Sequence, residues 1–142
     1  MDTVTNHPLI EQILSSWKEQ IGDIYQGYRG HVYRMFNCCL ALKPCTDDEK
    51  TKLAIAAAFH DIGLWSDHTV AYRDPAYPLV EIFRKGDLVD FSLGLFKFGL
   101  PSTLIARLKS EFPNAGFHKF LLGGAKDWFS KHPLSPPPFM RW

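Results

Sequence analysis

The spacing of the apolar residues most constrains what this chain can fold into, because that spacing is helical almost throughout. Near the N-terminus, apolar side chains recur at steps of three and four residues, the period of one helix face: Leu9, Ile10, Ile13, Leu14, Trp17, Ile21 and Ile24. No segment alternates apolar and polar residues with the two-residue period of a half-buried strand. The sequence therefore predicts an all-α fold.

Local start and stop signals divide the chain into about five to six helices, packed as a bundle. We expect the first helix to begin near residue 8 and the others to cover residues 31–42, 46–61, 79–95, 102–112 and 115–131. Thr46 and Glu49 form a capping-box pair that starts the third helix. Glycines mark the expected breaks: Gly27 to Gly30 before the second helix, Gly63 after the third, and Gly123 with Gly124 inside the last. Ser102 is the expected cap of the fifth helix, which ends before Pro113.

Size and charge favour a single cytoplasmic domain that covers residues 1–142. The chain has 142 residues, of which 46% are hydrophobic and 22% charged, so it has enough apolar surface to build a core. A net charge of +1 gives no reason to expect a nucleic-acid polymer as a partner. The longest apolar stretch, residues 53–59, is far short of the ~20 residues that cross a membrane. The first residues also lack the pattern of a secretory signal.

Three other features have structural interpretations. The proline-rich tail, residues 133–142, ends in apolar residues, and we expect it to dock on its own domain or on a second copy in a homodimer. Cys38 and Cys39 are adjacent and lack metal-site spacing, so buried packing is the better interpretation. His118 lies near a predicted helix end, where a surface or capping role is expected.

The most apolar predicted helix ends in two residues that are able to bind a metal ion. His60 and Asp61 directly follow the segment Leu-Ala-Ile-Ala-Ala-Ala-Phe at residues 53–59. An ionised aspartate next to such a segment is costly unless it is paired or bound to a metal. A metal site is one interpretation. The other is a helix-end aspartate that points to water beside a hydrogen-bonded core histidine.

Residues on two neighbouring helices support the metal interpretation. His31 opens the second predicted helix among apolar and aromatic residues, and Asp87 lies midway along the fourth, on the side expected to face the core. Side chains from three helices would then converge inside the bundle. Two imidazoles and two carboxylates suit a divalent ion such as Mn²⁺, Fe²⁺, Ni²⁺, Mg²⁺ or Zn²⁺. Asp90, one turn from Asp87 on nearly the same face, is an alternative to Asp87.

The order of these residues resembles the H…HD…D motif of the HD-domain superfamily of metal-dependent phosphohydrolases. The matching residues are His31, the pair His60-Asp61, and Asp87. Small bacterial HD proteins are also similar around residues 65–68 and 112–117, so the resemblance covers most of the chain from about residue 28. This chain is shorter than most HD domains between the His-Asp pair and the distal aspartate, where another helix usually lies.

The resemblance implies a phosphohydrolase that acts on a small phosphate ester, with a nucleotide as one candidate, through a metal-activated water. It implies that His31, His60, Asp61 and Asp87 hold the divalent ion and that Asp61 also orients the water.

Neighbouring residues supply the other expected roles. We expect Arg34, one turn beyond His31, to bind phosphate oxygens, ahead of Arg84 and Lys85. His68 is the candidate general acid or a hydrogen-bond partner of a metal ligand, and a plain loop role is the alternative. The alternative function is a non-enzymatic HD-fold protein, a metal-binding or regulatory module, and the shortened segment after Asp61 favours it.

Overall fold

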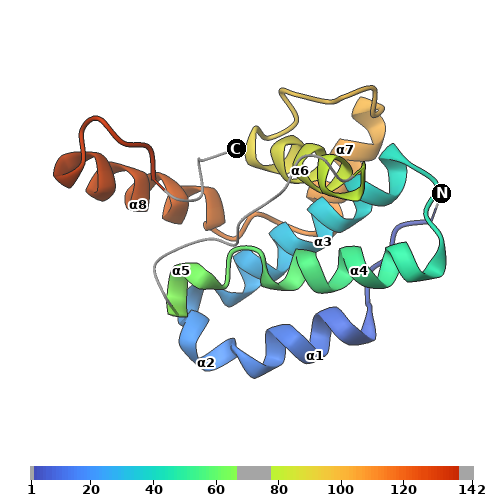
Figure 1. The fold of residues 1–142 in the computed structure, drawn as a ribbon, viewed down its shortest axis with the longest axis horizontal. Coiled ribbons are helices and arrows are strands. Elements are labelled where there is room, and N and C mark those ends of the chain that lie inside the picture. Colours follow the sequence, from blue (N-terminus) through green and yellow to red (C-terminus); the bar gives the residue numbers. More distant parts are fainter. Residues whose placement is uncertain (1, 67–77, 138–142) are drawn as a thin grey trace.

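The computed structural model describes residues 2–66 and 78–137, and over these ranges the chain is helical, without a strand (Figure 1). The helices are α1 (Pro8–Ser16), α2 (Lys18–Ile21), the 3₁₀ helix η1 (Gly22–Ile24), α3 (Tyr25–Leu42), α4 (Asp47–Phe59), α5 (Gly63–Ser66), α6 (Pro78–Phe91), α7 (Ser102–Glu111) and α8 (Phe117–Lys131). The predicted all-α class is confirmed. Within the described ranges, no helix combines the length and the apolar character that a membrane span requires.

The bundle is organised around α3. From bottom to top, Figure 1 shows α1, α4, α3 and α6 in that order, and α3 also contacts α7 and α8. The central residues of α3 are buried on every side, and Tyr28, Tyr33 and Phe36 supply the largest of these side chains. A helix that is buried all round needs partners on every face, which explains why the other helices pack against this one.

The start of α3 differs from the sequence-based expectation. Gly27 and Gly30 were expected to separate two helices, but both lie inside α3, which begins at Tyr25. A Cβ atom at Gly27 would lie 2.9 Å from the carbonyl oxygen of Asn114, and one at Gly30 would lie 2.9 Å from that of Pro113. These glycines therefore allow the segment before α8 to pack directly on the backbone of α3. The helix that starts at Pro8 ends early, at Ser16, and the chain reaches α3 through α2 and η1.

The capping box at the start of α4 is confirmed. Thr46 Oγ1 accepts from the Glu49 amide at 3.2 Å, and Glu49 Oε2 accepts from the Thr46 amide at 2.9 Å. The other end of α4 differs from the prediction, because the helix stops at Phe59 and Gly63 begins α5 instead of ending α4. His60 and Asp61 thus lie in the turn between α4 and α5.

Three further predicted boundaries were wrong. The fourth helix, α6, ends at Phe91 instead of residue 95, in a Schellman motif whose left-handed residue is Leu93, with φ 55°. Pro101, rather than Ser102, precedes the first turn of α7, and the Ser102 hydroxyl accepts from Lys97 instead. The glycine pair in α8 does not interrupt that helix, which runs continuously and extends away from the rest of the bundle (Figure 1).

Part of the proline-rich tail contacts α8. The indole nitrogen of Trp128 donates a hydrogen bond to the carbonyl oxygen of Ser135 at 2.9 Å, and Pro137 is buried. The apolar end of the tail, residues 138–142, lies outside the described residues, so the predicted docking of that end stays a prediction.

Candidate metal centre

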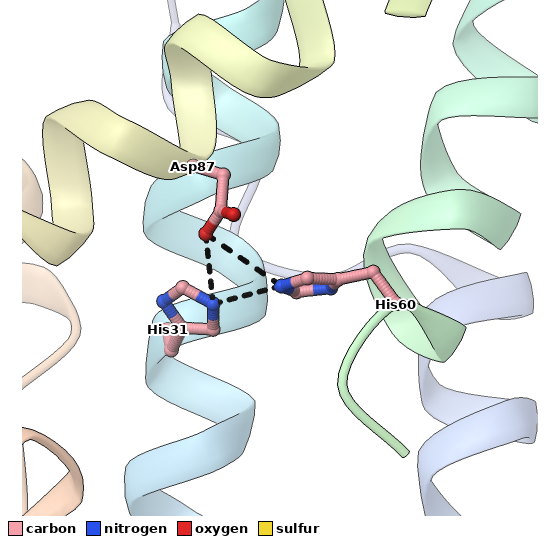
Figure 2. Close-up of side chains that lie close together, drawn as sticks. All are labelled: His31, His60 and Asp87. Carbon is pink, nitrogen blue, oxygen red and sulfur yellow. Dashed lines mark hydrogen bonds and ion pairs between the residues drawn. The ribbon is translucent and has the colours of Figure 1, made fainter. Parts of the chain in front are cut away.

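Three side chains from three segments of the chain converge inside the bundle (Figure 2). His31 comes from α3, His60 from the turn that ends α4, and Asp87 from α6; one ligand atom of each lies within 4.8 Å of the other two. The Nε2 atoms of His31 and His60 are 3.1 Å apart. Asp87 Oδ1 lies 3.5 Å from His31 Nε2 and 3.6 Å from His60 Nε2. These separations fit one ion held between the three groups.

Asp61 adds a fourth group at the same point. Its Oδ2 lies 3.1 Å from His60 Nε2 and 3.6 Å from His31 Nε2. All four side chains are buried, and each residue is between 1% and 6% exposed. The structure therefore brings together the four residues that the sequence analysis singled out as metal ligands, and the interpretation of Asp61 as a helix-end residue that points to water was wrong.

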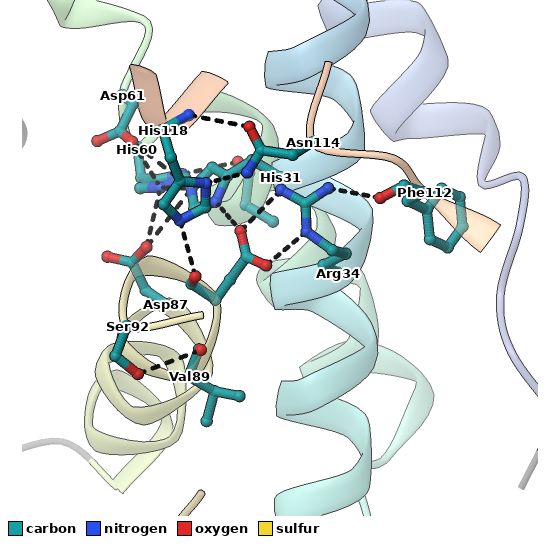
Figure 3. Close-up of polar contacts among 12 residues, drawn as sticks. His31, Arg34, His60, Asp61, Asp87, Val89, Ser92, Phe112, Asn114 and His118 are labelled. Carbon is teal, nitrogen blue, oxygen red and sulfur yellow. Dashed lines mark hydrogen bonds and ion pairs between the residues drawn. The ribbon is translucent and has the colours of Figure 1, made fainter. Parts of the chain in front are cut away.

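The outer nitrogen of each imidazole is hydrogen-bonded to an oxygen that can only accept (Figure 3). His31 Nδ1 lies 2.7 Å from Asp90 Oδ2, and His60 Nδ1 lies 2.8 Å from the carbonyl oxygen of Ala57. Each Nδ1 must then carry a proton, so in the neutral ring the Nε2 lone pair faces the centre. A histidine that binds a metal usually has the same hydrogen bond on its other nitrogen.

The centre therefore collects the inner nitrogens of two imidazoles and two carboxylates in a buried space. Burial by itself disfavours the imidazolium form of His60, but the charges and hydrogen bonds of Asp61 and Asp87 outweigh burial and raise the pKa of His60 to about 10. A buried group of acceptors requires a cation, and either a proton or a metal ion can serve. Two nitrogen and two carboxylate ligands form a donor set that fits a first-row divalent ion or Mg²⁺.

Aromatic side chains surround the two imidazoles. The Phe117 ring stacks on His31 with ring centroids 4.7 Å apart, and the Phe83 ring meets His60 edge-on at 5.4 Å. Tyr28 lies next to both imidazoles and donates its hydroxyl hydrogen bond to the carbonyl oxygen of Ala58, at 3.0 Å. These buried rings exclude water from the sides of the site and so strengthen the electrostatic interactions within it.

Asp87 and Asp90 were interchangeable in the sequence analysis, and the structure separates them. Both lie on the buried face of α6, but Asp87 lies on the Nε2 side of His31, and Asp90 lies on the Nδ1 side. Burial would raise the pKa of Asp90, but His31 and Arg34 outweigh burial and hold that pKa well below its usual range. Asp87 is therefore the candidate metal ligand, and Asp90 is an ionised hydrogen-bond partner of the candidate ligand His31.

The arginine that was expected to bind phosphate has other partners in this structure. Arg34 is 3% exposed, and its Nε and Nη2 donate to the two carboxylate oxygens of Asp90 at 2.5 and 3.0 Å. Its Nη1 donates to the carbonyl oxygen of Phe112 at 2.6 Å. This geometry favours a positioning role for Arg34 over contact with a substrate. The weaker candidates Arg84 and Lys85 both pair with Glu81.

A segment that the sequence analysis did not assign to the site contacts Asp90, the hydrogen-bond partner of His31. His118, expected at the surface, is half-buried, and its Nε2 donates to the backbone carbonyl of Asp90 at 2.9 Å. Asn114 accepts from the His118 amide at 3.1 Å and also hydrogen-bonds the His118 ring. Burial lowers the pKa of His118, in keeping with a neutral ring. The only sequence signal for this role was the resemblance to HD proteins at residues 112–117.

One prediction about this site stays a prediction. His68, the candidate general acid, lies within residues 67–77, outside the described residues. Comparisons with known proteins add no assignment, because no family model, curated protein or solved structure matches the chain.

Cys38 and Cys39 are buried as expected, and burial raises the pKa of the Cys38 thiol to about 12.

Proposed function

We propose that this protein is a divalent-metal-dependent phosphohydrolase of the HD type, acting on a small phosphate ester. The supporting observation is that His31, His60, Asp61 and Asp87 converge, and that the outer nitrogen of each histidine is already hydrogen-bonded. These four residues occur in the order H…HD…D that the HD motif requires.

The chain's own residues have distinct roles in this proposal. His31 and His60 present lone pairs, and Asp87 closes the third side of the site. Asp61 has two carboxylate oxygens, so one can hold the ion while the other accepts a hydrogen bond from the attacking water and orients it. When bound, a divalent ion would supply Lewis-acid chemistry, acidifying a water and polarising a phosphoryl oxygen.

One observation favours a second candidate function, a metal-binding or regulatory module without turnover. The three cations considered for phosphate binding, Arg34, Arg84 and Lys85, are all engaged with carboxylates of the chain itself. Phosphoryl transfer depends on positioning and on charge neutralisation. Without one of these cations, the bound ion and residues outside the described ranges would have to position the phosphate and neutralise its charge.

An Asp61→Ala variant tests the proposal, with Asp127→Ala on the exposed side of α8 as a matched control. We expect wild type and Asp127→Ala to bind one divalent ion and to hydrolyse members of a panel of nucleotides and nitrophenyl phosphates. Asp61→Ala should lose turnover to background and retain less metal. It should stay folded, because the substitution removes a buried charge.

Metal content by elemental analysis, phosphate release and thermal unfolding separate the possible outcomes. Metal binding without turnover in wild type would support the non-enzymatic module. Wild-type protein that stays metal-free after growth in medium supplemented with Mn²⁺, Ni²⁺ and Fe²⁺ would refute the phosphohydrolase and the metal-binding module.

A further inference from the structure

Asp90 joins three parts of the chain through one carboxylate. Its Oδ2 accepts from His31 of α3, and both of its oxygens accept from Arg34, one turn further along the same helix. Arg34 in turn donates to the carbonyl oxygen of Phe112, just after α7. The result is a continuous chain of charge-assisted hydrogen bonds from the end of α7 to the outer nitrogen of His31, in which every side chain is at most 5% exposed.

This chain of hydrogen bonds determines how His31 faces the centre. An ionised carboxylate can only accept, so His31 Nδ1 must donate, and the lone pair of the neutral ring lies on Nε2. The Nε2 atom is the one that lies within 3.6 Å of His60, Asp61 and Asp87. Phe117, stacked on the ring face, opposes tilting of the ring.

The packing of α6 on α3 makes this arrangement specific. Asp87 and Asp90 are one turn apart on α6, and they contact opposite nitrogens of the same imidazole. Gly86 permits the close approach of the two helices, because a Cβ there would overlap the Cys39 sulfur and would lie 3.1 Å from the carbonyl oxygen of Met35. α6 thus places one carboxylate beside each ring nitrogen of His31, with Asp90 hydrogen-bonded to Nδ1 and Asp87 next to Nε2 at the centre.

We propose that Asp90 is a positioning residue of the metal centre, which sets the tautomer and orientation of His31 and is itself held in place by Arg34 and the Phe112 carbonyl. This inference rests on the proposed metal-binding function. It assigns Arg34 to the support of the site instead of to the substrate. Outer-shell partners of this kind usually change metal affinity by 10–100-fold when they are removed.

Asp90→Asn tests the inference by calorimetric titration with Mn²⁺ and, separately, with Zn²⁺. We expect metal affinity to fall 10–100-fold, with one ion still bound at saturation. Glu81→Gln, which removes a half-buried carboxylate from the first turn of α6, is the matched control and should leave affinity unchanged. Arg34→Lys keeps the charge but loses the fork and the Phe112 bond, so it should give a smaller decrease.

A tautomer measurement separates positioning from general stability. Long-range ¹H–¹⁵N NMR spectra of the metal-free protein should show His31 protonated at Nδ1 in wild type and as a mixture of tautomers in Asp90→Asn. If Asp90→Asn does not fold, the same measurement on Arg34→Lys applies, and we expect an intermediate shift toward the second tautomer.

The outcomes distinguish this inference from the function on which it rests. Unchanged affinity and an unchanged His31 tautomer in a folded Asp90→Asn variant would overturn the inference. If wild type binds neither ion, the proposed metal function fails, while the tautomer spectra of metal-free wild type and variant still decide the role of Asp90.

Discussion

At the scale of single residues, burial determines how much an ion pair contributes to stability, as two carboxylates show. Asp90 is 5% exposed and pairs with the equally buried Arg34, so removing one partner would leave an uncompensated charge in the core, at a cost of about 3–5 kcal/mol. Glu11 pairs with Arg29 near the surface, where the two side chains are 31% and 25% exposed. Solvent screens that second pair, so its contribution is smaller.

A Glu11→Gln variant should show this smaller contribution as a pH-dependent difference in unfolding free energy from wild type. Burial would raise the pKa of Glu11, but hydrogen bonds from Arg29 and Tyr33 outweigh burial and lower that pKa below 4.5. Because the folded-state pKa lies below the unfolded value, ionised Glu11 stabilises the fold above about pH 4.5. This stabilisation is lost as the pH falls through the folded pKa.

Urea denaturation checks this prediction at two pH values. Wild type should exceed the variant in unfolding free energy by up to about 1 kcal/mol at pH 7, and the difference should be smaller at pH 3. A difference that is equal at both pH values would assign the contribution to the neutral hydrogen bond with Tyr33 instead of to the charge.

At the scale of the elements, close backbone contact decides where helices meet, and glycines permit it. Gly27 and Gly30 let the segment before α8 approach α3, and Gly86 does the same for α6. All three lie within helices, where glycine costs roughly 1 kcal/mol relative to alanine. Their cost to helix formation is therefore offset by packing that a side chain would block.

Paired glycine-to-alanine substitutions test this explanation. Gly30→Ala should lower the unfolding free energy by about 1–3 kcal/mol, because its Cβ would lie 2.9 Å from a backbone oxygen that cannot turn aside. Gly123→Ala in α8, where no atom lies within 4 Å of the added Cβ, should raise it by about 0.5–1 kcal/mol. Chemical denaturation measures both values. Stabilisation by Gly30→Ala would contradict the packing explanation.

At the scale of the whole molecule, the candidate metal centre links α3, the end of α4, and α6. Each of these segments carries an acceptor into one buried space, where only a proton or a metal ion can offset their mutual repulsion. An ion bound there would contact all three segments at once, and unfolding would release it. Binding of a metal ion at this centre would therefore be coupled to folding.

Metal removal should accordingly destabilise the fold. Adding Mn²⁺ or Zn²⁺ at 100 times its dissociation constant should stabilise the protein by about 2.7 kcal/mol, and chelation with EDTA should reverse this. Thermal unfolding with and without metal measures the effect. His60→Ala, which removes one candidate ligand, is the control and should show a much smaller shift. A melting temperature that does not respond to metal in wild type would contradict the coupling.

The sequence by itself determined the helical class, several of the helix starts and the four candidate ligands. Helical periodicity is a local property, and the capping box at Thr46 and Glu49 forms from residues three apart, so both are visible without the fold. His60 and Asp61 stood out because charge next to an apolar segment requires a partner.

Only the tertiary structure decided what lies between the helices. Gly27 and Gly30 have the signature of a break, and only the segment at residues 113–117 packed against them shows why they remain helical. Likewise, Asp87 and Asp90 are equivalent on an isolated helix, and Arg34 is an equally good fork for phosphate or carboxylate. Contacts between α3 and α6, which are distant in sequence, place Asp87 at the centre and Asp90 between His31 and Arg34. The sequence could not separate these roles, because each long-range contact depends on packing that no local pattern encodes.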